Sequence, residues 1–184
     1  MHTLHIIRPA MLALAALVVP ACSEDDPAGP DGPDYDPEIP AAWAAAVDNS
    51  WFPLQPGTTW EFSADTDDGL ETVVVEVLAE TRTINGVVAT VVRDREYLDG
   101  ELKEDTHDWY AQDAAGNIWY LGEDTKEIED GSVVSTEGSW EWGVDGALPG
   151  IIMWADPAAH VGEEYRQEFY EGEAEDWGKV VALN

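Results

Sequence analysis

The sequence predicts an all-β fold, in which an antiparallel up-and-down meander curls into an open or incomplete barrel of lipocalin-like or sandwich-like form. Two observations support this prediction. Between residues 70 and 142, strand-like runs such as Val73–Leu78 and Val87–Val92 alternate with glycine turns roughly fifteen residues apart. The turn residues supply the positive φ angles that tight hairpins require. The turns are Asn85-Gly86, Asp99-Gly100, Asp113–Gly116 and Asp130-Gly131.

Residues 1–21 are predicted to be a lipoprotein signal peptide. Arg8 precedes the apolar run Met11–Val19, which has the length of a secretory signal core and is too short to span a bilayer. The run ends in Val19-Pro20-Ala21-Cys22, which resembles the lipobox of bacterial lipoproteins. The resemblance implies diacylglycerol on the Cys22 sulfur, cleavage before Cys22 and acylation of the new amino terminus. The alternative is an ordinary secretory signal with an incidental cysteine.

The predicted lipidation decides the location that we expect for the protein. Cys22 is the only cysteine, so the chain cannot form an intrachain disulfide, and a thioether would remove a reactive thiol from an oxidising compartment. Two or more acyl chains anchor a protein stably to a membrane. We therefore expect an extracytoplasmic, membrane-anchored lipoprotein, located in the outer membrane or at the cell surface if the source is Gram-negative.

The remainder of the chain divides into a tether and a domain. Residues 22–40 are rich in proline and acidic residues, a composition that favours a disordered, extended spacer. Residues 41–184 are expected to form a single β domain. It begins with a short helix over Ala41–Val47, because alanine favours helices and Pro40 suits a first turn. The chain stops in the strand-like run Val180–Asn184, so we expect a domain truncated at its C-terminus.

Several short motifs extend over most of residues 51–180. They are FPLQPGTTW (Phe52 to Trp60), RDREYLDGEL (Arg93 to Leu102), DWYAQD (Asp108 to Asp113), VSTEGSWE (Val134 to Glu141) and PGIIM (Pro149 to Met153). With these motifs the chain resembles a family of uncharacterised bacterial secreted lipoproteins. The resemblance implies β-sheet architecture and implies no activity.

The charge and the residue inventory exclude several classes of function. The chain carries 8 basic and 39 acidic residues, for a net charge of −31. Nucleic acids and anionic membrane surfaces are therefore poor partners. After cleavage only His107 and His160 remain as histidines, and the sequence has no serine-hydrolase elbow, cysteine nucleophile or phosphate-binding loop. We expect a protein that is not an enzyme.

An acidic patch is predicted on one face of the first three meander strands. If the two hairpin turns are tight, Asp94 lies opposite Asp105, and the same face carries apolar valines. Opposed carboxylates are destabilising unless a cation neutralises them. A divalent cation such as Ca²⁺, Mn²⁺ or Zn²⁺ is thus one interpretation, and an exposed rim without any cofactor is the other. The candidate metal ligands are Asp94, Glu96, Asp105 and His107.

Nine tryptophans indicate either a ligand groove or a large aromatic core. A groove could bind sugar rings or an apolar small molecule. The candidate groove residues are Trp109, Trp119, Trp140, Trp142 and Trp154. We therefore expect a non-catalytic binding or structural module of the cell envelope. The alternatives are a divalent-metal-binding protein that uses the acidic patch and a glycan-acting hydrolase that uses two carboxylates.

Overall fold

The computed structural model describes residues 35–183, so the signal peptide, Cys22 and most of the tether lie outside the described residues. The all-β prediction is confirmed. The strands are β1 (Thr59–Thr66), β2 (Gly69–Ile84), β3 (Val87–Leu98), β4 (Glu101–Gln112), β5 (Ile118–Asp124), β6 (Glu127–Glu129), β7 (Ser132–Ser135), β8 (Trp140–Glu141), β9 (Leu148–Met153), β10 (Glu164–Arg166), β11 (Glu168–Phe169) and β12 (Trp177–Lys179). One short 3₁₀ helix, η2 (Pro157–His160), precedes β10.

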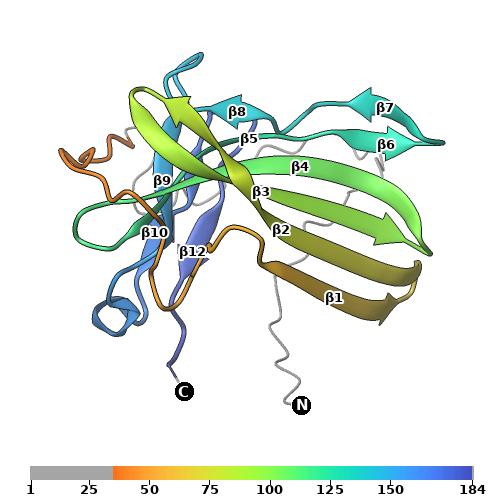
Figure 1. Ribbon diagram of the computed structural model, residues 1–184, viewed down its shortest axis with the longest axis horizontal. Helices are drawn as coiled ribbons and strands as arrows, with labels where there is room; N and C mark the ends of the chain where they lie inside the picture. The colour runs from red at the N-terminus through yellow and green to blue at the C-terminus, as the bar shows by residue number, and fades with distance from the viewer. Residues whose placement is uncertain (1–34, 184) are drawn as a thin grey trace, which may run out of the picture.

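The strands form one curled antiparallel sheet and a small accessory sheet. The main sheet has the order β1-β2-β3-β4-β5-β9-β11, with β6 and β8 paired to β4 and β5 and with β7 on β6. Strands β10 and β12 form the accessory pair. Figure 1 shows the long strands β2, β3 and β4 crossing the molecule side by side and curving as they go. The result is an open half-barrel rather than a closed one.

The predicted hairpin turns are present. Asn85, Asp99 and Asp130 have φ angles of 48°, 51° and 50°, and each is followed by a glycine with positive φ. Two consecutive residues with positive φ give the turn whose twist matches that of the flanking strands. The meander β2-β3-β4 therefore follows from local turn chemistry.

Two bulges change the residue pairing between the strands, so the predicted register is wrong on the side of each bulge away from its hairpin turn. Between β2 and β3, the three residues 78–80 lie opposite the single residue Val91. Between β3 and β4, the register shifts by one at Lys103, so that Asp94 lies opposite Thr106 and Arg95 lies opposite Asp105. A shift of one residue moves every following side chain to the other face of its strand. This second bulge decides where the predicted site residues lie.

The helix expected over Ala41–Val47 is also wrong. This stretch is extended, with bends, and Trp43 forms a β-bridge with Asp113. The Ala44 N–H donates to the Gln112 carbonyl at 2.8 Å. The segment thus pairs with the end of β4, and these tertiary contacts outweigh the intrinsic preference of alanine for helix. Among the described residues, no helix has the length and apolar character needed to cross a membrane.

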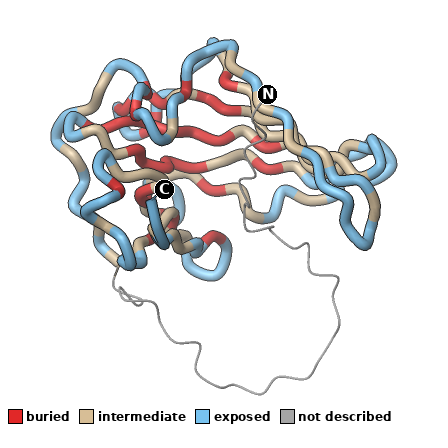
Figure 2. The backbone as a smooth tube through the Cα atoms, turned by 90° about the horizontal axis from the view of Figure 1, so that it is seen from below, coloured by how far each residue is buried: buried red, intermediate tan, exposed pale blue. Residues whose placement is uncertain are grey.

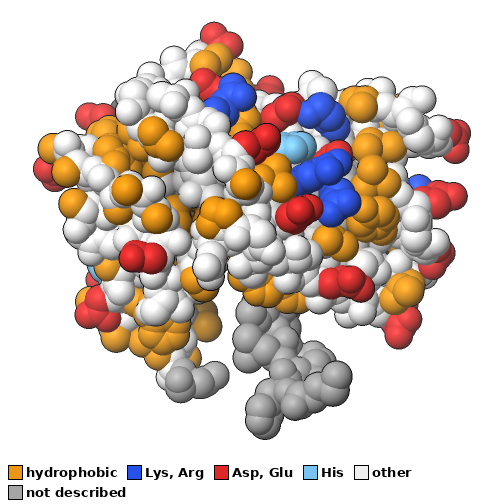
Figure 3. Space-filling view, in the orientation of Figure 1, with side chains coloured by type: hydrophobic (Ala, Val, Ile, Leu, Met, Phe, Trp, Pro, Cys, Tyr) orange, Lys and Arg blue, Asp and Glu red, His pale blue; other side chains and the backbone are white. Residues whose placement is uncertain are grey.

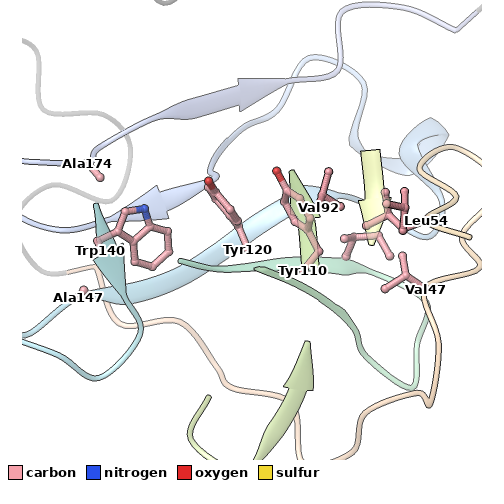
Figure 4. Packing of buried hydrophobic residues seen from close by; sticks show 10 residues of the cluster. Val47, Leu54, Val92, Tyr110, Tyr120, Trp140, Ala147 and Ala174 are labelled. Atoms are coloured by element: carbon pink, nitrogen blue, oxygen red, sulfur yellow. The ribbon is translucent and has the colours of Figure 1, made fainter. Parts of the chain in front are cut away.

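Both faces of the sheet are buried near its centre. One face, here called the tyrosine face, carries Val77, Val92, Tyr110, Tyr120 and Trp140. Figure 4 shows the side chains of this cluster, which also includes Val47 and Leu54 from the segment before β1. The opposite face, here called the tryptophan face, carries Ala89, Val91, Trp109, Ala111, Trp119, Leu121 and Ile151. Figure 2 shows that burial is concentrated in one half of the long strands, whereas the distal hairpin ends are exposed.

Candidate ligand-binding site

The bulge at Lys103 separates the four predicted metal ligands. Val91 lies opposite Trp109 on the tryptophan face, and alternation along the strands puts Asp105 and His107 on that face. Asp94 and Glu96 belong to the tyrosine face instead. The predicted opposition of Asp94 and Asp105 is therefore wrong. Within residues 35–183, no three His, Cys, Asp or Glu side chains are arranged to hold a metal ion.

Asp105 takes part in an ion-pair ladder on the tryptophan face. It accepts two hydrogen bonds from Arg93, at 2.7 and 2.6 Å, and Arg95 pairs with Glu76 at 3.4 Å. The hydrogen bond from Arg93 lowers the pKa of Asp105 below its usual value. The bulge at Lys103 places Asp105 opposite Arg95 and next to Arg93 on this face. Figure 3 shows Lys and Arg side chains gathered beside a histidine on this side of the molecule.

Four of the five predicted groove tryptophans lie together on the tryptophan face. Trp109 and Trp119 are buried there, and Trp142 and Trp154 are half-buried at its edges. Trp140 lies in the core of the tyrosine face. Trp43, which the sequence analysis did not include, packs between Trp119 and Trp142, with ring centroids 6.0 and 6.5 Å away. Trp43 thus covers part of the aromatic surface that the sequence predicted as a groove.

A pocket of about 310 Å³ lies at one end of the tryptophan face, and we call it the Trp154 pocket. Trp119, Ile151, Trp154 and Tyr165 form its largely apolar walls. Asn117, Arg166 and the segment that includes Tyr35, Pro37 and Glu38 complete it. The wall residues come from β5 and β9, from Trp154 just after β9, from β10, and from residues 35–38 at the end of the predicted tether. No single stretch of sequence contains the pocket.

The aromatic walls of the Trp154 pocket are held in defined orientations. Trp154 stacks on His160 with centroids 3.9 Å apart, and it meets Tyr165 edge-on at 5.4 Å. Tyr35 donates a hydrogen bond to the Pro149 carbonyl at 2.9 Å and packs against Phe169. These contacts hold Trp154 and the segment around Tyr35 in place before any ligand binds. Less conformational entropy is therefore lost on binding.

Arg166 contributes a cation to the lining of this pocket. Its side chain is buried, lies between the rings of Trp177 and Phe169, and donates to the Glu175 carbonyl at 2.9 Å. The Arg166 Nε and the Trp154 Nε1 have no hydrogen-bond partner among the described residues. The pocket therefore combines aromatic walls with a few polar side chains, those of Glu38, Asn117 and Arg166, a combination typical of small-molecule sites.

A buried carboxyl cluster on the tyrosine face was missed by the sequence analysis. Asp108 lies directly opposite Glu123 and accepts a hydrogen bond from Tyr120 at 2.5 Å, while Glu168 accepts one from Trp140 at 2.8 Å. Burial raises the pKa of Glu123 to about 8, with a further contribution from Glu168. Burial and then Asp176 raise the pKa of Glu168 to about 7. Neither glutamate lines the Trp154 pocket.

Known proteins give no guide to this site. Comparison with family models, with curated proteins and with solved structures finds no match to this chain.

Proposed function

We propose that this chain is an extracytoplasmic lipoprotein whose β domain binds a small ring-bearing ligand, a sugar or an apolar ring, in the Trp154 pocket. The protein acts by binding, without catalysis. Lipids on Cys22 hold it to the membrane, and residues 23–34 separate the domain from the surface. The observation that carries the proposal is the pocket itself, which has aromatic walls held by ring contacts and only a few polar groups.

The residue types of the pocket favour this ligand class. An indole presents an apolar face that packs against the apolar face of a sugar or another ring. Arg166 can donate to an oxygen at the ring edge, and Glu38 can accept from a hydroxyl group. The volume of about 310 Å³ falls at the lower end of the range for small-molecule sites.

Native mass spectrometry of protein purified from its own envelope tests the proposal. We expect a retained small molecule on the parent protein and its loss in Trp154→Ala, because that substitution removes one aromatic wall. Trp51→Ala is the matched control, since Trp51 is 51% exposed and lies outside the pocket. Equal retention by both variants would place the ligand elsewhere, and a parent protein without any adduct would count against a resident ligand.

A further inference from the structure

A second pocket, of about 360 Å³, lies at the other end of the tryptophan face, and we call it the Arg82 pocket. Its lining includes Glu80, Arg82, His107, Trp109 and Asp124. The pocket lies between two places where the strand register shifts. The bulge over residues 78–80 of β2 borders it, and the β4–β5 register shifts beside Trp109. Bulges often redirect side chains next to functional sites.

The chain's own Arg82 fills a cation-binding position in this pocket. The Arg82 guanidinium carbon lies 4.0 Å from the centroid of the Trp109 ring. Glu141 holds the same guanidinium from β8, accepting from Nε at 3.1 Å and from a second nitrogen at shorter range. An indole face with a carboxylate behind it is the arrangement that binds guanidinium and ammonium groups.

Arg82 is held weakly enough to be displaced. Its side chain is 48% exposed, and ion pairs and cation–π contacts at exposed positions contribute little to stability. The space beside it carries further negative charge. The Glu80 side chain has no hydrogen-bond or ion-pair partner within residues 35–183, and Asp124 pairs with Lys126 at 2.6 Å. His107 completes the wall, with its Nδ1 lacking a hydrogen-bond partner among the described residues.

We infer that the Arg82 pocket is a second binding site, which takes a guanidinium group from outside the chain in the place of Arg82. The incoming group stacks on Trp109 and pairs with Glu141 and Glu80, and Arg82 swings out into solvent. The net charge of −31 raises the concentration of cations around the protein and favours such a ligand. The guanidinium can belong to a small alkylguanidine or to an arginine side chain of a peptide.

Isothermal titration calorimetry on the full-length protein, at constant ionic strength, tests this site. The probes are agmatine, a blocked Gly-Arg-Gly peptide and a ureido analogue of agmatine, which has nearly the same shape without the charge. We expect saturable binding of a guanidinium probe and none of the ureido analogue. Tighter binding of agmatine identifies a small cation as the ligand, and tighter binding of the peptide identifies an arginine side chain.

The decisive variant is Arg82→Ala. It removes the internal competitor, so affinity for the guanidinium probe should rise about three- to tenfold. Lys103→Ala is the matched control, because it removes one exposed positive charge outside the pocket and should leave affinity unchanged. Glu80→Gln should weaken binding, whereas Glu71→Gln, an exposed change on the same strand, should not.

Four outcomes would overturn the inference. The first is no saturable binding by either the parent or Arg82→Ala. Arg82→Ala and Lys103→Ala could raise affinity equally, which is the result of bulk charge alone. Arg82→Ala could weaken binding, which would make Arg82 part of the ligand contact. Equal binding of the ureido analogue would show that the charge is not recognised.

Discussion

Asp113 organises the β4–β5 turn through hydrogen bonds from the backbone and from two side chains. Its Oδ1 accepts from the N–H groups of Ala115 and Asn117 at 2.8 and 2.9 Å. Its Oδ2 accepts from the Asn117 amide and from the Trp119 indole at 2.9 and 3.0 Å. Burial alone would raise the pKa of Asp113, but these hydrogen bonds outweigh it and hold the pKa below its usual value. One carboxylate thus fixes a turn and orients a wall of the Trp154 pocket.

Replacing Asp113 with Ala should therefore destabilise the protein. The substitution leaves buried N–H donors without an acceptor, and each such donor costs about 1–3 kcal/mol. We expect a loss of about 3 kcal/mol in the free energy of unfolding, measured by urea denaturation. Asp67→Ala, in the exposed β1–β2 turn, should change it by less than about 0.5 kcal/mol. Similar losses for the two variants would contradict the central role of Asp113.

At the scale of elements, the carboxyl cluster joins four strands across the tyrosine face. Asp108 belongs to β4, Glu123 to β5 and Glu168 to β11, and Trp140 of β8 donates to Glu168. Glu123 and Glu168 have pKa values of about 8 and about 7, so both are largely protonated near pH 6. The attachment of β8 and β11 to the sheet thus depends on carboxyl groups that ionise near neutral pH.

The stability of the protein should fall as the pH rises from 5 to 8. In the unfolded chain both glutamates titrate near the ordinary glutamate pKa of 4.5, so between that pH and the folded pKa the native state binds more protons than the unfolded state. Under this condition the free energy of unfolding decreases with pH, by up to about 1.4 kcal/mol per unit for each group. Asp105 and Asp113 have lowered pKa values in the folded protein. Their contribution to the stability of the protein is therefore lost only as the pH falls below their unfolded pKa, near 4. The maximum should therefore lie at about pH 5.

Glu168→Gln separates this effect from general charge repulsion. Glutamine keeps an acceptor for Trp140 and mimics the protonated acid, so the variant should be more stable than the parent at pH 8 and similar at pH 5. Glu171→Gln is the control, because Glu171 is exposed and undergoes the same loss of charge. Thermal unfolding at the two pH values provides the measurement. Equal gains at pH 8 in both variants would show that net charge alone is responsible.

Local chemistry explains which elements could be predicted from the sequence. The tight turns depend on the φ preferences of two residues, so Asn85-Gly86 and Asp99-Gly100 were sufficient to predict the meander. The bulge at Lys103 depends on the whole sheet, because it sets Trp109 opposite Val91 on one buried face. The helix expected over Ala41–Val47 failed for the same reason, since its pairing with β4 is a long-range contact.

The candidate site was predictable only in composition. The tryptophan count indicated an aromatic surface, and four of the five chosen residues do share a face. Only three of these four line a pocket, Trp119 and Trp154 in one and Trp109 in the other, and the contacts of Trp43 and Arg82 with this face come from distant parts of the chain. The carboxyl cluster escaped the sequence analysis because Asp108 and Glu123 become neighbours only in the observed register.

At the scale of the whole molecule, the few basic side chains are paired with acidic ones, but acidic residues remain in large excess. Each of the seven lysines and arginines in residues 35–183 forms an ion pair with an acidic side chain. The acidic residues exceed them several-fold, so most acidic charge has no basic partner to offset it. The surface as a whole therefore repels anionic polymers and anionic lipid headgroups.

This charge makes the proposed lipid anchor testable. Cleavage before Cys22 would remove Arg8 and leave seven basic residues against 39 acidic ones, so electrostatic attraction cannot hold the mature protein on an anionic membrane. Acyl chains on Cys22 would have to provide the attachment, because each buried methylene adds about 0.8 kcal/mol and two chains suffice for stable anchoring.

Cys22→Ala should therefore shift the protein from the membrane fraction to the soluble fraction, as measured by immunoblotting after ultracentrifugation. Ser23→Ala, the neighbouring control, should remain with the membrane. If the Cys22→Ala protein still sediments with membranes after a high-salt wash, then something other than lipid on Cys22 attaches the protein.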